Sequence, residues 1–157
     1  LDLFFTAVTS LGNSVTFYIL APLAALVLLW RDKKLEALFV SACLLASWGL
    51  DNILKMAFSR PRPPGPALVL AAGYSFPSGH AMISLAFYGF IAFLIVRNWD
   101  NICGKSVALG LSLVILLIGL SRVYLNVHYA SDVIAGWVFG AAVLGLFVWG
   151  LIKVENR

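Results

Sequence analysis

The chain has 157 residues, of which 62% are hydrophobic and only 11% are charged, and its mean hydropathy is +0.97. A water-soluble domain of this length cannot bury so many apolar side chains, because its surface is large relative to its volume. The composition therefore excludes a soluble globular protein and predicts one that lies in a lipid bilayer. The formal net charge of +4 does not indicate binding to nucleic acid, since the basic residues lie in short clusters between long apolar runs.

Five apolar runs are long enough to cross the roughly 30 Å hydrocarbon core of a bilayer as helices. They are Val15–Trp30, Leu35–Phe58, Ser78–Val96, Lys105–Ser121 and Asp132–Ile152. Five of the six prolines lie between Ser59 and Pro77, where none interrupts a span. Before the first run, apolar residues at helical spacing over residues 1–11 predict a short interfacial helix, or else the end of an upstream span. We therefore expect an all-α, polytopic membrane bundle that forms a single domain over residues 1–157.

The distribution of Lys and Arg predicts the orientation of this bundle. One side of the membrane would carry Arg31, Lys33, Lys34, Arg97, Lys105, Lys153 and Arg157, and the other Lys55, Arg60, Arg62 and Arg122. Basic residues are enriched in cytoplasmic loops, so the first side is predicted to be cytoplasmic. The sequence thus predicts a multi-pass protein of the plasma membrane (the inner membrane of a bacterium), with the C-terminus in the cytoplasm.

Nearly all unusual polar residues fall at the outward ends of the second to fifth spans. Lys55 closes the second span and Arg62 follows it, while Ser78, Gly79 and His80 open the third. Arg122 follows the fourth span, and His128 with Asp132 leads into the fifth. Because successive helices cross the membrane in opposite directions, all of these ends are predicted to meet on one face.

The residue types at this face suit an oxyanion. Lys55, Arg62 and Arg122 are three cations, and arginine can grip a phosphate through two parallel hydrogen bonds. Ser78 is a candidate N-cap, and Gly79 allows a ligand to approach the positive end of the helix dipole. Three cations without matching carboxylates are costly unless an anion binds among them. The face is therefore predicted to be a phosphate site.

Two histidines, the only ones in the chain, lie at the same face. Asp132 follows His128 by four residues, so on a helical turn it would accept a hydrogen bond from the imidazole and activate it. His80 would then be a general acid. A single basic residue at the end of a span is usually only an anchor, and a single histidine is usually structural, but their combination on one face favours catalysis. Cys43 and Cys103 have no metal-ligand neighbours, so no metal or cofactor is expected.

These residues resemble the signature of the type 2 phosphatidic acid phosphatases, a family related to vanadium-dependent haloperoxidases. The signature K-x6-RP, PSGH and SR-x5-H-x3-D matches without a gap across residues 55–132, at Lys55, Arg62-Pro63, Pro77-Ser78-Gly79-His80, Ser121-Arg122, His128 and Asp132. The resemblance implies that His128 is a nucleophile forming a phosphohistidine, that Asp132 orients it, and that His80 protonates the leaving oxygen and later activates water. It also implies that Lys55, Arg62, Ser78, Gly79 and Arg122 bind the phosphoryl oxygens and that no metal is needed. Members commonly have six spans, and either a lost N-terminal span or a five-span variant would explain the five counted here.

The activity expected is removal of phosphate from a lipid at the outer face of the plasma membrane. Candidate substrates are undecaprenyl diphosphate, phosphatidylglycerol phosphate, phosphatidic acid and lipid A 1-phosphate, and the sequence does not choose among them or specify an oligomeric state. Two alternatives are a phosphotransferase with the same phosphohistidine and a non-catalytic transporter or scaffold that binds a phospholipid. Asp51 lies one turn before Lys55 inside a span, so we predict that it pairs with Lys55 or Arg62 and positions that cation. The apolar segment 67–74 would guide a lipid tail, or would be an ordinary surface loop.

Overall fold

The structure is a computed structural model that describes all of residues 1–157 and consists of helices and irregular connections. The helices, in chain order, are α1 (Asp2–Ser10), α2 (Ser14–Trp30), α3 (Lys34–Phe58), α4 (Gly79–Asn98), α5 (Ile102–Tyr124) and α6 (Ala130–Glu155). Each of the five predicted spans corresponds to one of the helices α2 to α6, and the ends differ by at most three residues. The all-helical fold class predicted from the sequence is confirmed.

Four of these helices, α3 to α6, are each long and apolar enough to cross a membrane. Helices α1 and α2 meet at a bend of 44° and are sufficiently long and apolar only as a pair, which gives up to five spans. Pro22 lies inside α2, where it removes one backbone donor from the helix. The chain is thus a multi-pass membrane protein, while an interfacial position for α1 stays a prediction.

Helix α4 lies at the centre of the bundle and packs against α3, α5 and α6. Most of its surface is buried, including Phe87 and Phe90, whereas the other long helices leave most of their surface exposed. Two glycines of α6 permit the close approach of α4. A Cβ atom on Gly136 would lie 2.7 Å from the Ser78 carbonyl oxygen, and one on Gly140 would lie 2.6 Å from that of Met82. Small residues four apart are a common device for close packing of membrane helices.

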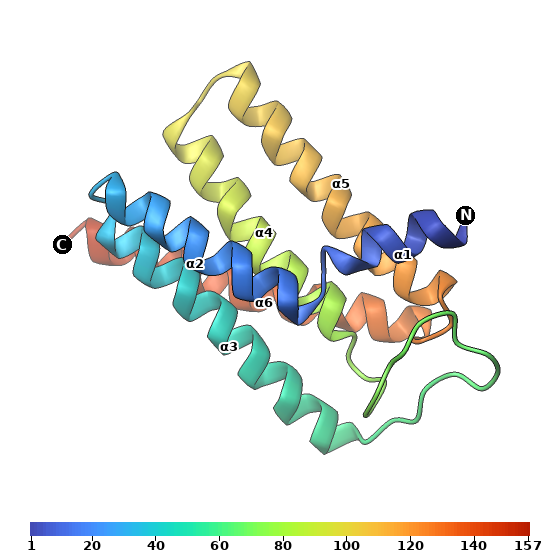
Figure 1. Cartoon of the computed structure of the whole chain (residues 1–157). Coiled ribbons are helices and arrows are strands. Elements are labelled where there is room, and N and C mark those ends of the chain that lie inside the picture. The colour runs from blue at the N-terminus through green and yellow to red at the C-terminus, as the bar shows by residue number, and fades with distance from the viewer.

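The long connection between α3 and α4, residues 59–78, lies at the same end of the bundle as the N-terminus and the connection between α5 and α6 (Figure 1). We call these two connections the α3–α4 loop (residues 59–78) and the α5–α6 loop (residues 125–129). A backbone bond from the Ser78 N–H to the Asp132 carbonyl, 2.9 Å long, joins the start of α4 to the start of α6. This end of the bundle therefore holds the beginnings of α4 and α6 and the ends of α3 and α5, together with α1.

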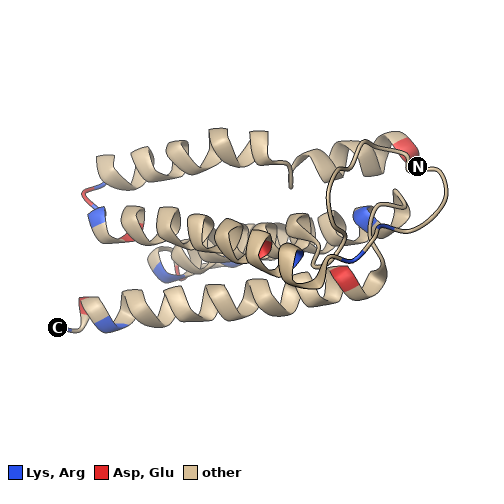
Figure 2. Ribbon diagram, turned by 90° about the horizontal axis from the view of Figure 1, so that it is seen from below, with Lys and Arg blue, Asp and Glu red and all other residues tan.

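Charged residues lie mostly toward the two ends of the bundle, and long uncharged stretches of helix separate them (Figure 2). At the end that holds the C-terminus, Arg97 pairs with Glu155 at 2.6 Å and Lys33 pairs with Glu36 at 3.0 Å. Between the ends, leucine, isoleucine and valine side chains cover the outer faces of the helices. This distribution is what a lipid environment requires, because apolar side chains face the hydrocarbon and charges face water.

Candidate active site

A cavity of about 520 Å³ lies at the end of the bundle where α3 ends and α4 begins. Seven of the nine residues predicted for the site line this cavity, namely Asp51, Lys55, Arg62, Gly79, His80, Arg122 and His128. The other two, Ser78 and Asp132, are fully buried and do not line it. The structure thus brings together residues from three helices and two loops, as the alternating direction of the spans predicted.

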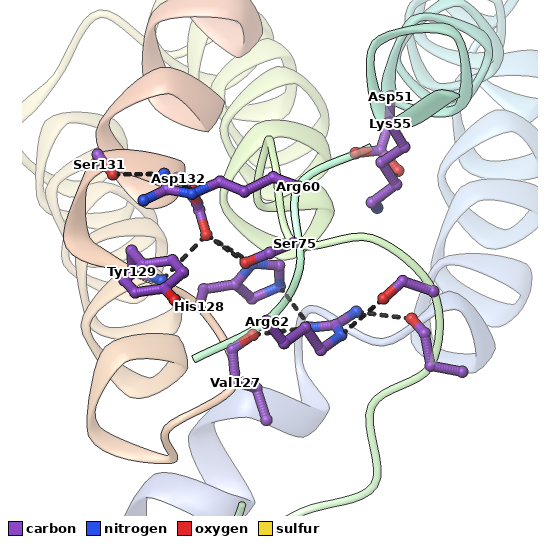
Figure 3. A network of polar contacts seen from close by, with 12 residues as sticks. Asp51, Lys55, Arg60, Arg62, Ser75, Val127, His128, Tyr129, Ser131 and Asp132 are labelled. Carbon is purple, nitrogen blue, oxygen red and sulfur yellow. Dashed lines mark hydrogen bonds and ion pairs between the residues drawn. The ribbon is translucent and has the colours of Figure 1, made fainter. Parts of the chain in front are cut away.

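His128 lies in the α5–α6 loop, which folds back onto the end of α5, so that the backbone N–H groups of Val127 and His128 both donate to the Arg122 carbonyl oxygen at 3.2 Å. The His128 ring is buried beside the cavity, and Arg62 Nη1 lies 3.3 Å from its Nε2 atom (Figure 3). A guanidinium can only donate, so this contact requires a lone pair on Nε2. We therefore assign the ring proton to Nδ1 and the free lone pair to Nε2, on the cavity side.

Asp132, in the first turn of α6, lies behind the other ring nitrogen. Its Oδ2 atom is 3.6 Å from His128 Nδ1, which is beyond hydrogen-bond range. Three other donors already bind this carboxylate: Ser75 Oγ, the Tyr129 N–H at 3.0 Å and Arg60 Nη1 at 2.7 Å. Ser75 Oγ also lies 3.4 Å from His128 Nδ1. The direct hydrogen bond predicted from the four-residue spacing is therefore not made, since His128 precedes the helix and the carboxylate is shared.

The electrostatic surroundings keep the His128 imidazole neutral. Burial, together with the positive charges of Arg122 and Arg62, lowers its pKa to about 3, and the opposing effects of Ser75 and Asp132 are smaller. A neutral ring at physiological pH has a free lone pair, which a nucleophile requires. Burial also lowers the pKa of Arg62, while Asp132 and Asp51 oppose this shift. An arginine nevertheless stays protonated at physiological pH.

Lys55 is held by Asp51 from the preceding turn of α3. Lys55 Nζ donates to Asp51 Oδ2 at 2.5 Å, which confirms the predicted pairing. Gly79 packs directly on this pair, and a Cβ atom at that position would lie 2.9 Å from both Lys55 Nζ and Asp51 Oδ2. A side chain at position 79 would therefore displace this ion pair, so the glycine allows the start of α4 to pack closely on α3.

Arg62 fastens the α3–α4 loop over the cavity. Its Nε donates to the Gly73 carbonyl at 3.1 Å, and its Nη2 donates to the Ala72 carbonyl at 2.7 Å. Its Nη1 donates to the Val127 carbonyl at 2.8 Å and so joins the two loops. Leu70, Ala71 and Ala72 of this loop line the cavity, and the Leu70 side chain is fully exposed. One side chain thus positions the loop and also presents a cation to the cavity.

Arg122 approaches the cavity from the end of α5 and is almost completely buried. Its Nη1 donates to Thr9 Oγ1 of α1 at 2.7 Å, while its Nε has no hydrogen-bond partner. Ser78 Oγ is likewise buried without a partner, although Ser78 is the N-cap of α4. An unpaired buried donor is costly, so Arg122 Nε, which belongs to a residue that lines the cavity, is suited to an acceptor-rich ligand. Ser78 itself does not line the cavity, although its neighbour Gly79 does.

His80, in the first turn of α4, contacts the bend between α1 and α2. Its Nε2 lies 2.8 Å from Asn13 Oδ1, and because an amide oxygen only accepts, Nε2 carries a proton in this arrangement. Gly12 packs on the same ring, where a Cβ atom would lie 3.0 Å from His80 Cδ2. The two histidines therefore differ at Nε2: His128 presents a lone pair there, whereas His80 presents a proton.

No group of three or more His, Cys, Asp or Glu side chains is arranged to hold a metal ion. Cys43 is buried and Cys103 is exposed, and neither forms a disulfide. The residues of the cavity are suited to an anion instead, because cations and N–H or O–H donors predominate among its polar groups.

The profile of the PAP2 superfamily matches residues 36–155, which is most of the chain and includes every site residue predicted from the sequence. The chain belongs to the PAP2 superfamily. This membership confirms the resemblance inferred from the three motifs and places the chain among membrane lipid phosphatases.

Named relatives and a solved structure agree with the assignment to the PAP2 superfamily. Phosphatidylglycerophosphatase B of Bacillus subtilis is 31% identical over 94% of this chain and 71% of that protein. Undecaprenyl-diphosphatase of Sulfolobus acidocaldarius is 32% identical over 83% of this chain, which spans 63% of that enzyme's length. The crystal structure of a transmembrane PAP2-type phosphatidylglycerolphosphate phosphatase from Bacillus subtilis superimposes with a TM-score of 0.90 and 28% identity, covering 98% of this chain and 77% of that one.

Four polar residues of this PAP2 site were not found from the sequence: Thr9, Asn13, Arg60 and Ser75. Ser75 directly precedes the Phe76-Pro77-Ser78 segment, and Arg60 was counted only as a basic residue of the outward side. The pattern Arg60-Pro61-Arg62-Pro63 was a usable signal, because two arginines two residues apart at a phosphate site suggest related roles. Thr9 and Asn13 gave no such signal, since their partners lie 113 and 67 residues away.

Proposed function

We propose that this chain hydrolyses the phosphomonoester or diphosphate group of a membrane lipid through a phosphohistidine on His128. One observation carries the proposal. The Nε2 lone pair of His128, the proton on His80 and the cations Lys55, Arg62 and Arg122 border the same cavity. We further propose that residues 1–157 act as one domain, because side chains from α1, α3, α4, α5 and both loops contribute to this site.

In the first step, His128 Nε2 attacks phosphorus in line with the leaving lipid oxygen. A nitrogen–phosphorus bond forms while the bond between phosphorus and the lipid oxygen breaks. For this step His80 must be an imidazolium, with a proton on both ring nitrogens; it transfers the Nε2 proton to the leaving oxygen and becomes neutral, so the lipid leaves as an alcohol or, from a diphosphate, as a monophosphate. Before substrate binds, the His80 Nε2–H donates to Asn13 Oδ1, which keeps the proton on Nε2. For the transfer this N–H must donate to the leaving oxygen in place of Asn13.

In the second step, water attacks the phosphohistidine and His80, now neutral, accepts a proton from that water. The nitrogen–phosphorus bond breaks, phosphate leaves, and His128 regains its lone pair. During both steps negative charge develops on the phosphoryl oxygens. Arg62, Arg122 and Lys55 supply positive charge there, and the unpartnered Arg122 Nε supplies a further donor. Ser78 Oγ, which is buried next to the cavity-lining Gly79, would have to turn toward the phosphoryl group to donate to it. The first turn of α4, which begins at Gly79, supplies free N–H groups.

We place the site at the outer face of the membrane, with the C-terminus in the cytoplasm. Seven Lys or Arg residues lie at the opposite end of the bundle and four at the cavity end, and the difference supports this orientation. The exposed Leu70 at the cavity rim supports a lipid as the substrate, since its side chain is placed to contact an acyl or isoprenoid tail. Candidate lipids are undecaprenyl diphosphate, phosphatidylglycerol phosphate, phosphatidic acid and lipid A 1-phosphate.

The deciding experiment measures phosphate release by the detergent-purified protein from each of these four lipids in the presence of a chelator. His128→Ala is the test variant, with near-unchanged thermal stability as the check that it folds. We expect release from at least one lipid, loss of that release in His128→Ala, and an acid-labile phosphoprotein trapped only with an intact His128. Release that needs added metal, or that persists in His128→Ala, would refute the mechanism.

The same experiment separates hydrolysis from phosphate transfer. A phosphotransferase would form the same phosphohistidine but yield a newly phosphorylated lipid in place of free phosphate. A binding protein without chemistry would retain the lipid in both the wild type and His128→Ala. We expect free phosphate, because a cavity of about 520 Å³ has room for water beside the phosphoryl group.

A further inference from the structure

Arg60 contacts the catalytic aspartate from outside the cavity. It lies in the α3–α4 loop, two residues before Arg62, and is not among the residues that line the cavity. Its Nη1 donates to Asp132 Oδ1 at 2.7 Å and to Ser131 Oγ at 2.8 Å, and its guanidinium lies 4.1 Å from the centre of the Tyr129 ring (Figure 3). The guanidinium is therefore fixed both by hydrogen bonds and by an aromatic face.

Asp132 needs such a partner because its side chain is completely buried. A buried carboxylate is strongly destabilising unless a cation and hydrogen-bond donors compensate its charge. Arg60 is the one Lys or Arg that forms an ion pair with it. The two carboxylate oxygens are divided between partners: Oδ1 faces Arg60, whereas Oδ2 faces Ser75, the Tyr129 N–H and the ring of His128.

We propose that Arg60 is a positioning residue: it anchors Asp132 and offsets its charge, so that Oδ2 and Ser75 orient His128 while Nε2 keeps its lone pair. The inference rests on the proposed role of His128 as nucleophile. If Asp132 faced His128 alone, its full charge would draw a proton onto the imidazole, and both ring nitrogens would then be protonated. The 3.6 Å separation of Oδ2 from Nδ1, longer than a hydrogen bond, is what an aspartate held elsewhere would show.

Six other charged or titratable side chains surround His128. They are Arg62 on the α3–α4 loop, Arg122 on α5, His80 on α4, Lys55 and Asp51 on α3, and Asp132 on α6. Arg62 and Arg122 lower the pKa of His128 and Asp132 raises it. Arg60 contacts Asp132 and not His128, so loss of its charge would leave the effect of Asp132 unopposed. His128 would then bind its proton at a higher pH than in the wild type.

The test compares Arg60→Gln, Arg60→Lys and the control Arg97→Gln. Arg97 is matched to Arg60, because each side chain is 36% exposed and pairs with one carboxylate, but Arg97 lies at the opposite end of the bundle. For Arg60→Gln we expect kcat at neutral pH to fall about tenfold with KM within about twofold, and the acid limb of kcat/KM to move up by roughly one pH unit. Arg60→Lys should restore part of both, and Arg97→Gln should change neither.

A second measurement does not depend on catalysis. The chain has only two histidines, so NMR of protein labelled with ¹⁵N-histidine, assigned with His128→Ala, follows the His128 ring directly. We expect Arg60→Gln to raise the pH at which His128 takes up its second ring proton. An unchanged NMR titration, or a loss of kcat that is equal at every pH, would overturn the proposal. A wild type without phosphatase activity would instead refute the proposed function, and the NMR comparison would still decide the role of Arg60.

Discussion

Replacing Asp51 with asparagine tests whether Lys55, the lysine that we propose binds phosphate, must be held by the Asp51 carboxylate. The Lys55 ammonium donates to Asp51 at 2.5 Å, and Asp51 is 6% exposed. A hydrogen bond between charged groups contributes about 2 kcal/mol, and each 1.36 kcal/mol corresponds to about tenfold in rate. If this hydrogen bond serves to hold Lys55 in place in the transition state, its loss in Asp51→Asn should lower kcat/KM roughly thirtyfold. The isosteric amide keeps the volume, so Gly79 and the start of α4 need not move.

The assay is phosphate release by purified protein, measured together with thermal unfolding in the same detergent. Glu36→Gln is the matched control, because Glu36 is also about 5% exposed and pairs with Lys33 at 3.0 Å, but at the end of the bundle away from the cavity. We expect the two variants to lose similar stability and only Asp51→Asn to lose activity. Unchanged turnover in Asp51→Asn, or an equal loss of activity in Glu36→Gln, would show that the pair is merely structural.

Three further predictions concern acid stability, the proton on His80 and helix packing. The pKa of His128 is about 3 in the folded chain and 6.5 in a free histidine, so the unfolded chain binds more protons than the folded chain between pH 6.5 and 3. Thermal stability should therefore fall as the pH drops through this range, and it should fall less in His128→Gln. Asn13→Ala removes the acceptor of the His80 N–H, so steady-state kinetics should show kcat about fivefold to tenfold lower with little change in KM. Gly140→Ala should destabilise the bundle by about 1–3 kcal/mol in thermal or denaturant unfolding, because its Cβ would lie 2.6 Å from a backbone oxygen of α4, whereas Gly145→Ala, which has open space around it, should not.

The helices were predictable because a membrane requires long, uninterrupted apolar runs, and the sequence contains them. The ends of α5 were missed by three residues on each side, because Ile102 and Tyr124 are compatible with both helix and loop. The 44° bend between α1 and α2 was not predicted. It lies at Leu11–Asn13, where Gly12 and Asn13 are turn-forming residues that indicate a break between two helices but not the angle between them.

Convergence of the predicted site residues was also foreseeable, since it follows from the alternating direction of the spans. The Asp51–Lys55 pair was predictable in the same way, because residues four apart lie on the same side of a helix. Contacts between distant segments were not predictable. Arg60 meets Asp132 across 72 residues of sequence, and His80 meets Asn13 across 67. Such contacts depend on how helices pack, which hydrophobic periodicity does not specify.

The structure also changes the balance of charge at the phosphate site. Three cations, Lys55, Arg62 and Arg122, were expected there, and Asp51 was predicted to pair with Lys55 or Arg62. In the structure Lys55 is paired with Asp51, and a fourth cation, Arg60, is paired with Asp132. Only Arg62 and Arg122 have no carboxylate partner, and both donate to neutral groups, namely backbone carbonyls and Thr9.

These pairings suggest different roles for the basic residues that have a carboxylate partner and those that have none. Lys55 and Arg60 each have a local anion, so they can hold the shape of the site whether or not a substrate is bound. Arg62 and Arg122 leave two positive charges uncompensated, and a phosphate monoester carries nearly two negative charges at neutral pH. The match in charge favours the phosphoryl group itself as the ligand of these two arginines. The same match in charge explains why Arg62 and Arg122 can lie in the site without a carboxylate partner, since the substrate provides the compensating negative charge.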